Sequence, residues 1–181
     1  SQRIQQIIGD LKNYVRKGKP DLTERIDINA VIKSALILVA HLIRKSTRHF
    51  NVRYGEHLPG LIGNGQRLEQ MIINLIQNAC QALPNPQAGI SVSTDFDQAQ
   101  RRIVLTIEDQ GSGIPAENLP RITDTFYTTK YEEGGVGLGL SISSKIVEEH
   151  GGSMHFTSES GKGTTVKINL PINRDGKIRK G

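Results

Sequence analysis

Apolar residues recur at the three- and four-residue spacing of an amphipathic helix in several stretches of the chain. Each of these stretches is followed by glycine, proline or a polar turn, which is where helices end. Either Asp27 or Asn29 can serve as the N-cap of the second helix, since both side chains carry a suitable acceptor. The predicted helices are residues 1–17, 30–45, about 65–83 and about 138–150.

Shorter segments of alternating or wholly apolar residues predict strands. These strands are residues 25–28, 50–54, 90–96, 102–108, 154–158 and 165–170. Residues 111–135 are polar and weakly periodic, and a loop of that length in a compact domain is usually functional or mobile. We expect residues 115–134 to form a mobile lid. The pattern therefore predicts an α/β two-layer sandwich, in which about three helices cover one face of a mixed sheet.

The composition narrows the class of protein. The chain has 181 residues, 36% hydrophobic and 23% charged, as in ordinary folded domains. No apolar run is long enough to cross a bilayer, and the chain starts at Ser1 without methionine. We therefore expect a fragment of a larger protein, which could carry a membrane anchor elsewhere. The single cysteine, Cys80, forms no internal disulfide and favours a cytoplasmic setting. The net charge of +5 is scattered, which argues against a nucleic-acid partner.

The helix at residues 65–83 carries an unusual polar stripe beside its apolar one. Asn74 and Asn78 are four residues apart and so lie on one face. Asparagine disfavours helix interiors because its amide competes for backbone hydrogen bonds, so the pair calls for an explanation. One explanation is a magnesium site, since amide oxygens are suitable ligands for this cation. The alternative is an ordinary solvated helix face.

A carboxylate and two glycines follow the apolar strand at residues 102–108. Asp109 would accept a hydrogen bond from the exocyclic amine of adenine, a group that guanine replaces with a carbonyl. Gly111 and Gly113 let the backbone turn tightly beneath a base. The alternative is an Asx-type turn between a strand and a loop, without a ligand.

A third glycine-rich segment opens the helix at residues 138–150. Gly135, Gly137 and Gly139 would admit a phosphate close to the helix N-terminus, where free N–H groups favour anions. The spacing does not fit a P-loop, and no hydrophobic strand precedes the glycines as a dinucleotide-binding fingerprint requires. The alternative is a flexible hinge.

In their order and spacing these motifs resemble the N, G1, F and G2 boxes of sensor histidine kinases, whose ATP-binding domains belong to the GHKL superfamily. The matching segments are residues 70–83, 109–114, 126–130 and 135–140. The resemblance spans about residues 22–172 and implies the GHKL fold, with ATP and Mg²⁺ as cofactors. The Asn-Ala-Cys-Gln-Ala-Leu and Phe-Tyr-Thr-Thr-Lys segments are similar to kinases of the nitrogen-regulatory type.

The resemblance also implies a role for individual residues. Asn78 would be the magnesium ligand, and Asn74 would support the phosphates or the metal. Asp109 would contact the adenine amine, with Thr165 assisting through water, and Lys130 would reach a phosphate from the lid. Asn74, Asn78 and Lys130 are the implied catalytic residues. The other residues implied to bind nucleotide are Gly111, Gly113, Ile114, Phe126, Thr128, Thr129, Gly135, Gly137, Leu138, Gly139 and Leu140.

Histidine kinases phosphorylate a histidine on a dimerisation helix, and none of the five histidines here stands in such a setting. His41 lies in a mostly apolar segment, so we expect a core position, and His150 ends a helix at a glycine cap. The resemblance implies that residues 1–20 are the second helix of a dimerisation hairpin, 21–172 the catalytic domain and 173–181 a basic tail. The expected partners are a dimerisation domain bearing the acceptor, in a full-length homodimer, and a response regulator.

Two other functions compete with a histidine kinase fragment that acts on an external acceptor. A hydrolytic GHKL ATPase would need a glutamate one turn before the metal ligand to activate water, and this chain has Asn74 there. A non-catalytic, nucleotide-gated interaction module would bind ATP without releasing the γ-phosphate. Whether that phosphate leaves, and to which acceptor, separates the three.

Overall fold

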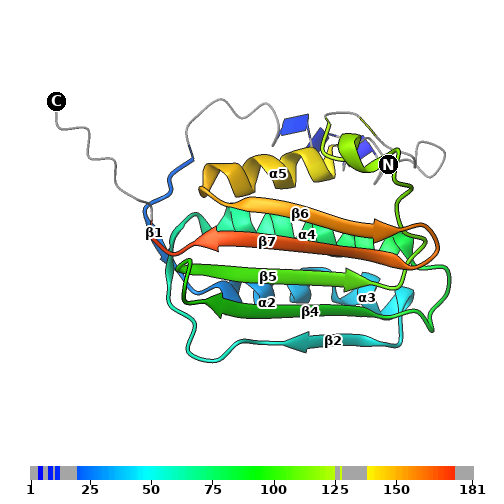
Figure 1. Cartoon of the computed structure of the whole chain (residues 1–181), viewed down its shortest axis with the longest axis horizontal. Helices are drawn as coiled ribbons and strands as arrows, with labels where there is room; N and C mark the ends of the chain where they lie inside the picture. Colours follow the sequence, from blue (N-terminus) through cyan, green and yellow to red (C-terminus); the bar gives the residue numbers. More distant parts are fainter. Residues whose placement is uncertain are drawn as a thin grey trace.

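The computed structural model of the chain describes residues 4, 5, 8, 9, 11, 12, 20–124, 127 and 138–173. They form a five-stranded sheet with a layer of helices on one face (Figure 1). The strand order is β2-β4-β5-β7-β6, with β2 parallel to β4 and the other neighbours antiparallel. The strands are β2 (Phe50–Arg53), β4 (Ile90–Asp97), β5 (Arg102–Asp109), β6 (Ser153–Glu159) and β7 (Gly163–Pro171).

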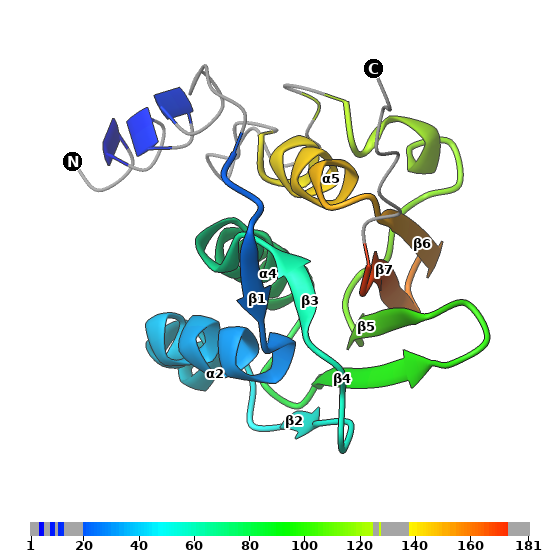
Figure 2. The same cartoon turned by 90° about the vertical axis from the view of Figure 1, so that its left-hand side faces the viewer.

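Figure 2 shows the helices together on one side of this sheet. They are α2 (Ile28–Leu38), α3 (Ala40–Ser46), α4 (Gly65–Ala82) and α5 (Gly139–Glu149). A second, antiparallel sheet of β1 (Glu24–Ile26) and β3 (Leu61–Gly63) lies where α4 begins. The six described residues between positions 4 and 12 are also helical. The predicted two-layer α/β sandwich with a mixed sheet is confirmed.

One face of the sheet is apolar and the other is polar, as expected of antiparallel strands buried on one side. Along β5, Ile103, Leu105 and Ile107 are at most 2% exposed, whereas Glu108 is exposed. Because side chains alternate along a strand, this parity places the next residue, Asp109, on the helix side. The predicted stripe of α4 supplies the opposing core. Its buried members are Leu68, Met71, Ile72, Leu75, Ile76 and Ala79, while Leu83 is only partly buried.

The N-cap of α2 settles one choice that the sequence left open. Asp27 caps the helix, since its Oδ1 accepts hydrogen bonds from the backbone N–H groups of Asn29 and Ala30. The Asn29 side chain instead donates to the carbonyl of Gly55 and accepts from Thr94. These bonds join the start of α2 to the sheet.

The structure departs from the predicted elements in three places. The helix predicted over residues 30–45 divides at Val39, whose φ of −104° and ψ of 9° leave the helical range. His41 is exposed at the start of α3, so the predicted core position is wrong. His41 is two residues from both Val39 and Ile43, which are buried, so it lies on the opposite side of the helix. Strand β3 was not predicted, because it has only three residues, follows Gly60 and ends at Gly63. Within the described residues, no helix is long and apolar enough to span a bilayer.

Candidate functional site

The loop after β5 is held in place at both ends of its turn. The Oδ1 atom of Asp109 accepts a hydrogen bond from the backbone N–H of Gly111 over 2.8 Å, which forms the Asx-type turn that was one interpretation of this motif. Ser112 donates its N–H to the carbonyl of Ala82 at the end of α4, and its own carbonyl accepts from Gly161 in the β6–β7 hairpin. The loop is thereby fixed between α4 and that hairpin, and the bond to Gly111 fixes the orientation of the Asp109 carboxylate.

Three glycines of this region are required by close backbone contacts. A Cβ on Gly113, where φ is +71°, would lie 2.0 Å from the carbonyl oxygen of Glu159. A Cβ on Gly163, where φ is +101°, would lie 2.0 Å from the carbonyl oxygen of Asp109. At Gly111 a Cβ would approach Ala82 within 2.6 Å. The backbone around Gly111, Gly113 and Gly163 is therefore closely packed, and we call it the floor of the candidate site.

A serine and a threonine join this floor to the sheet, and neither was predicted. The Ser158 Oγ accepts from the N–H of Ile114 and lies 2.8 Å from the Thr164 hydroxyl. Thr164 is directly opposite Asp109 in the pairing of β5 with β7. The predicted Thr165 pairs with Glu108 and lies on the other face of the sheet, so the prediction that Thr165 assists Asp109 is wrong by one residue. The buried residues Val166, Ile168 and Leu170 share the parity of Thr164 and could have identified it.

The asparagine face of α4 lies next to the beginning of α5. Asn74 and Asn78 are both half-buried on α4. The Asn74 amide donates to the carbonyl of Gly139 over 3.4 Å, so the asparagine face of α4 contacts the first residue of α5. These two motifs are far apart in the sequence, and the antiparallel packing of α4 with α5 joins them.

The first residues of α5 leave its N-terminus suited to an anion. The N-cap residue is Leu138, which makes no side-chain capping bond and is itself buried in the core at 1% exposure. The residue after Leu138 is Gly139, where an added Cβ would meet no described atom within 4 Å. Packing of the described residues therefore does not require glycine at this position, in contrast to Gly113 and Gly163. Helix N–H groups and the positive end of the helix dipole favour negative ligands here.

The Asp109 carboxylate lies beside the C-terminal end of α4, since a Cβ on Gly111 would lie 2.6 Å from both the Asp109 Oδ1 and the Ala82 Cβ. Burial raises the pKa of the Cys80 thiol, a hydrogen bond with Ser46 lowers it, and the negative charge of Asp109 raises it. The end of β5, the asparagine face of α4 and the start of α5 thus converge on one region.

Part of the predicted site lies outside the described residues. The predicted residues in that part are Phe126, Thr128, Thr129, Lys130, Gly135 and Gly137. Of the expected lid, residues 115–124 and Tyr127 are described. They include a short 3₁₀ helix, Leu119–Arg121, and the Arg121 guanidinium lies 4.5 Å from the centre of the Tyr127 ring.

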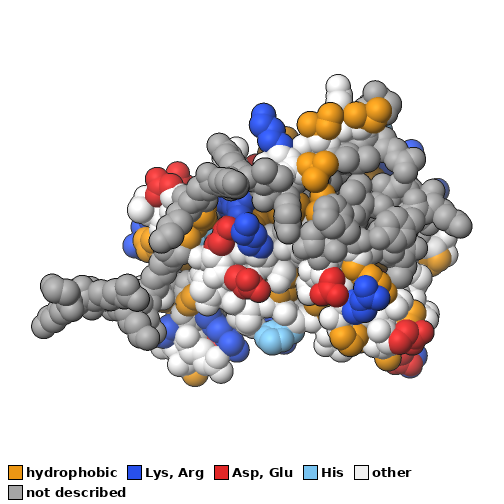
Figure 3. All heavy atoms as spheres, turned by 90° about the horizontal axis from the view of Figure 1, so that it is seen from above, with side chains coloured by type: hydrophobic (Ala, Val, Ile, Leu, Met, Phe, Trp, Pro, Cys, Tyr) orange, Lys and Arg blue, Asp and Glu red, His pale blue; other side chains and the backbone are white. Residues whose placement is uncertain are grey.

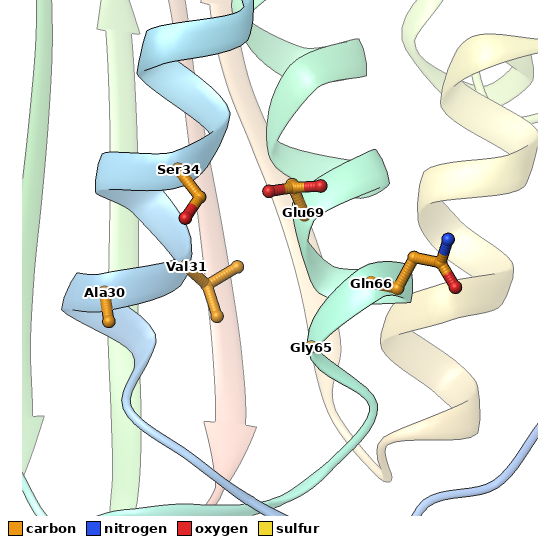
Figure 4. A pocket seen from close by; sticks show the side chains of 6 residues that line it. All are labelled: Ala30, Val31, Ser34, Gly65, Gln66 and Glu69. Carbon is orange, nitrogen blue, oxygen red and sulfur yellow. The ribbon is translucent and has the colours of Figure 1, made fainter.

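A shallow groove between α2 and α4 is separate from this region. Figure 4 shows Val31 and Ser34 pointing from α2 toward α4, with Glu69 facing them from α4. The full lining is Ala30, Val31, Ser34, Gly65, Gln66 and Glu69. The groove lies at the N-terminal end of α4, where its lining residues are about 14–20 Å along the helix from Asn78 at 1.5 Å per residue. On the molecular face in Figure 3, acidic and basic side chains are intermixed and form no patch of a single sign.

The described residues fit a purine nucleotide bound with a divalent cation. An oriented carboxylate lies at the end of β5, two half-buried amides lie on α4, and the start of α5 has room at Gly139. Amide and carboxylate oxygens are the ligands that Mg²⁺ prefers, and no described cluster of three or more histidine, cysteine or acidic side chains suits another metal.

Comparison with known proteins identifies the family. Residues 63–174 match the family of histidine kinase-, DNA gyrase B-, and HSP90-like ATPases. This match covers more than half of the chain and contains the Asp109 loop, the asparagine face of α4 and the start of α5. The chain therefore belongs to this family of ATPase domains. The predicted family resemblance is confirmed, while the nitrogen-regulatory subtype stays a prediction.

Several curated relatives carry the names of sensor proteins. A sensor protein of Shewanella frigidimarina is 39% identical over 168 residues, which are 93% of this chain and 25% of that protein. The sensor histidine kinase ZraS of Escherichia coli is 32% identical over 175 residues, which are 96% of this chain and 36% of ZraS. The chain thus spans between a quarter and just over a third of the length of these relatives.

Solved histidine kinase domains share the fold. The catalytic domain of the histidine kinase ThkA superposes with a TM-score of 0.72 at 27% identity, covering 83% of this chain and 98% of the ThkA domain. The mycobacterial sensor histidine kinase MprB gives a TM-score of 0.71 at 28% identity, covering 82% of this chain and 97% of that structure. Nearly the whole of each domain is therefore represented in this chain.

Proposed function

We propose that the chain is the catalytic domain of a two-component sensor histidine kinase, which transfers the γ-phosphate of Mg-ATP to a histidine on a separate dimerisation helix. The observation that carries the proposal is the convergence of three motifs. The Asp109 loop contacts the C-terminal end of α4 through the bond from Ser112 to Ala82, and the start of α5 contacts the asparagine face of α4 through the bond from Asn74 to Gly139. Relatives that are named sensor histidine kinases support phosphoryl transfer to histidine as the reaction of this ATPase fold.

Each motif contributes a separate part of the chemistry. Asp109 accepts from the adenine amine, and its Asx turn fixes the orientation of the carboxylate. The N–H groups at the start of α5, beside Gly139, bind phosphate oxygens. Asn78 would hold the magnesium ion, and Asn74 would support the phosphates. The bound cation supplies charge neutralisation on the phosphates, which together with positioning accounts for most catalysis of phosphoryl transfer.

The residue one turn before the metal ligand favours transfer over hydrolysis. Asn74 carries an amide, and an amide takes up no proton at neutral pH, so it does not activate water as a general base. Its donation to the Gly139 carbonyl gives the side chain a positioning role. The acceptor of the phosphate is then a side chain brought in by another domain.

We propose the following division of the chain and its partners. Residues 21–172 are the catalytic domain, residues 1–20 the second helix of a dimerisation hairpin, and residues 173–181 a basic tail. The side chains of Ile4 and Ile8, each 57% exposed, support a helix whose apolar stripe packs in a bundle. The partners are a dimerisation domain that bears the phosphoacceptor, in a homodimeric parent protein, and a response regulator.

One transfer assay tests the proposal. The chain is incubated with labelled ATP, magnesium and a separate dimerisation hairpin carrying an acceptor histidine. We expect acid-labile label on the hairpin, none on the chain alone, and only slow release of free phosphate. Rapid labelling of the chain itself would show that its acceptor is internal. Fast release of phosphate would favour a hydrolytic ATPase, and binding without either outcome would favour a nucleotide-gated interaction module.

A further inference from the structure

The C-terminal end of α5 meets the turn between β3 and α4 through a buried imidazole. His150 is 2% exposed, and its Nε2 accepts a hydrogen bond from the backbone N–H of Asn64 over 3.0 Å. Its Nδ1 lies 2.7 Å from the carbonyl oxygen of Ile146. Because a backbone N–H can only donate, Nε2 is the bare nitrogen and Nδ1 carries the proton toward Ile146. The ring therefore has one defined tautomer and bridges two elements.

The backbone of β3 is shaped to admit this ring. A Cβ placed on Gly63 would lie 2.5 Å from Cδ2 and 2.6 Å from Nε2 of His150. Any side chain at position 63 would therefore displace the imidazole or the strand. The close approach of Gly63 indicates that the contact between His150 and the turn is a built feature of the fold.

Asn64 extends the contact to the segment that enters the domain. Its Oδ1 accepts from the N–H of Arg67 and so caps α4, and its Nδ2 donates to the carbonyl of Asp21 over 2.9 Å. Three parts of the chain thus meet at Asn64: the segment before β1, the start of α4 and, through His150, the end of α5.

A second link reinforces the same corner. The guanidinium of Arg67 donates to both carboxylate oxygens of Glu149, with distances from 2.6 to 3.2 Å. The two side chains are only 18% and 17% exposed, so water screens the pair less than it would on the surface. The N-terminal turn of α4 and the C-terminal turn of α5 are therefore held together at two points.

The opposite end of α5 is the phosphate end of the proposed site. The helix has 11 residues and is about 16 Å long at 1.5 Å per residue. Figure 2 shows α5 next to α4. One end of α5 contacts α4 through Glu149 and Arg67, and at the other end the Gly139 carbonyl accepts from Asn74. Because a packed helix moves as a unit, a shift at His150 is carried to Gly139.

We propose that His150 is a positioning residue for phosphoryl transfer: it sets the place of α5 along α4, and with it the place of Gly139 opposite Asn74. Through Asn64 it also ties that placement to the entering segment at Asp21. This inference rests on the proposed function for its catalytic readout. The structural part, that His150 holds α5, stands on the contacts alone.

Three variants of the whole chain test the role of the Nε2 acceptor. His150→Leu removes the acceptor and leaves the Asn64 N–H unpaired. His150→Gln restores a carbonyl that can accept from this N–H. His155→Leu is the matched control, because His155 is exposed on β6. All measurements are made below the thermal unfolding transition of each variant.

The first readout needs no nucleotide. Amide hydrogen exchange is followed on the ligand-free chain at Ile142 to Ile146 in α5 and at Leu75 to Ala79 in α4. We expect His150→Leu to speed exchange in the α5 segment relative to the α4 segment, and His150→Gln to restore most of the protection. Equal acceleration in both helices would indicate a general loss of stability and would overturn the proposal.

The second readout is transfer to a separate acceptor hairpin. We expect His150→Leu to lower kcat about tenfold or more, since small displacements in a reacting geometry are costly, with ADP affinity changed less than threefold. His155→Leu should match the wild type, and His150→Gln should recover most of the rate. A His150→Leu variant with wild-type kcat overturns the inference. A wild-type chain that transfers no phosphate overturns the proposed function instead, and hydrogen exchange then still decides whether His150 holds α5.

Discussion

Thr164 lies directly opposite Asp109 in the antiparallel pairing of β5 with β7, and its hydroxyl is 2.8 Å from the Oγ of Ser158. The same serine accepts the backbone N–H of Ile114 in the loop that follows Asp109. The threonine is thus connected to both ends of this loop. The next residue along β7, Thr165, is on the opposite face of the sheet.

This relationship gives a matched pair of variants. Thr164→Val removes a hydroxyl beside the loop, and Thr165→Val makes the same chemical change on the solvent face. We expect Thr164→Val to weaken ATP binding several-fold to about tenfold, because one hydrogen bond contributes about 1 kcal/mol. Thr165→Val should bind as the wild type does. Calorimetric titration measures both, and the reverse order of effects would restore the role predicted for Thr165.

Replacement of Asp109 by asparagine tests the adenine contact. Asp109→Asn keeps an oxygen that can accept from the Gly111 N–H, so the Asx turn should persist. ATP affinity should fall about tenfold or more, because a hydrogen bond to a charged group contributes about 1.5–3 kcal/mol. Glu108→Gln, on the other face of β5, is the control. Unchanged affinity in folded Asp109→Asn would rule out the adenine role.

The asparagine face of α4 gives a magnesium-dependent prediction. Asn78→Ala should weaken ATP binding in the presence of magnesium about tenfold or more, as expected when a metal site loses a supporting group. Binding measured in excess chelator should change little. Gln81→Ala, exposed near the end of the same helix, should behave as the wild type under both conditions. An equal loss with and without magnesium would make Asn78 a structural residue.

Two glycines predict opposite effects of the same substitution. Gly139→Ala should leave the free energy of unfolding unchanged or raise it by up to about 1 kcal/mol, since alanine favours helices. It should nevertheless weaken ATP binding, because the methyl group occupies space at the phosphate end of α5. Gly163→Ala should lower the free energy of unfolding by about 1–3 kcal/mol or more, because of its positive φ and the close carbonyl of Asp109. Urea unfolding and calorimetry together separate the two outcomes.

The buried Cys80 thiol and the partly buried Tyr54 hydroxyl predict how stability changes at alkaline pH. Burial raises the pKa of Cys80 above its ordinary value of 9.0 and that of Tyr54 above 10.0. Both groups hold their protons more tightly in the folded chain, so their contribution to stability is complete below these ordinary values. The free energy of unfolding should fall as pH rises past about 9 and fall further past about 10. Urea unfolding from pH 7 to pH 11 measures this dependence.

Single variants assign the two parts of that dependence. Cys80→Ala should flatten the decline that starts near pH 9, and Tyr54→Phe should flatten the part that starts near pH 10, in line with their ordinary pKa values. His155→Leu, on the solvent face of β6, should leave the curve unchanged. If neither substitution altered the slope, other groups would account for the alkaline decline.

The sequence predicted well wherever a periodic pattern determined the structure. The apolar stripe of α4 and the alternating burial of β5 are the patterns that predict the two layers. The alternation along β5 also indicates that Asp109 faces the helices. The sequence failed at Val39, because Ile32, Ala35, Val39 and Ile43 keep their helical spacing across the break and are all buried. It also failed at Thr165, because choosing between two adjacent threonines requires the strand register.

The corner at His150 was also beyond the sequence. A histidine before two glycines predicts a helix end, and it does end α5. Its partner is the backbone N–H of Asn64. Since every residue except proline has such a group, no sequence pattern could single it out. Contacts between a side chain and a distant backbone group depend on the fold, so they appear only in the structure.

The way in which the Asp109 loop is held bears on how freely this site can diverge. Ser112 contributes its N–H and carbonyl to the loop, and Gly161 its N–H, so these anchors use main-chain atoms. The side chain at position 112 is therefore available for change without loss of the loop's shape, whereas position 113 is closed to everything except glycine. A small molecule that competes for the nucleotide pocket would therefore meet the same backbone at position 113 in related domains but different side chains at position 112. Selectivity between related domains would come from contacts with such variable side chains.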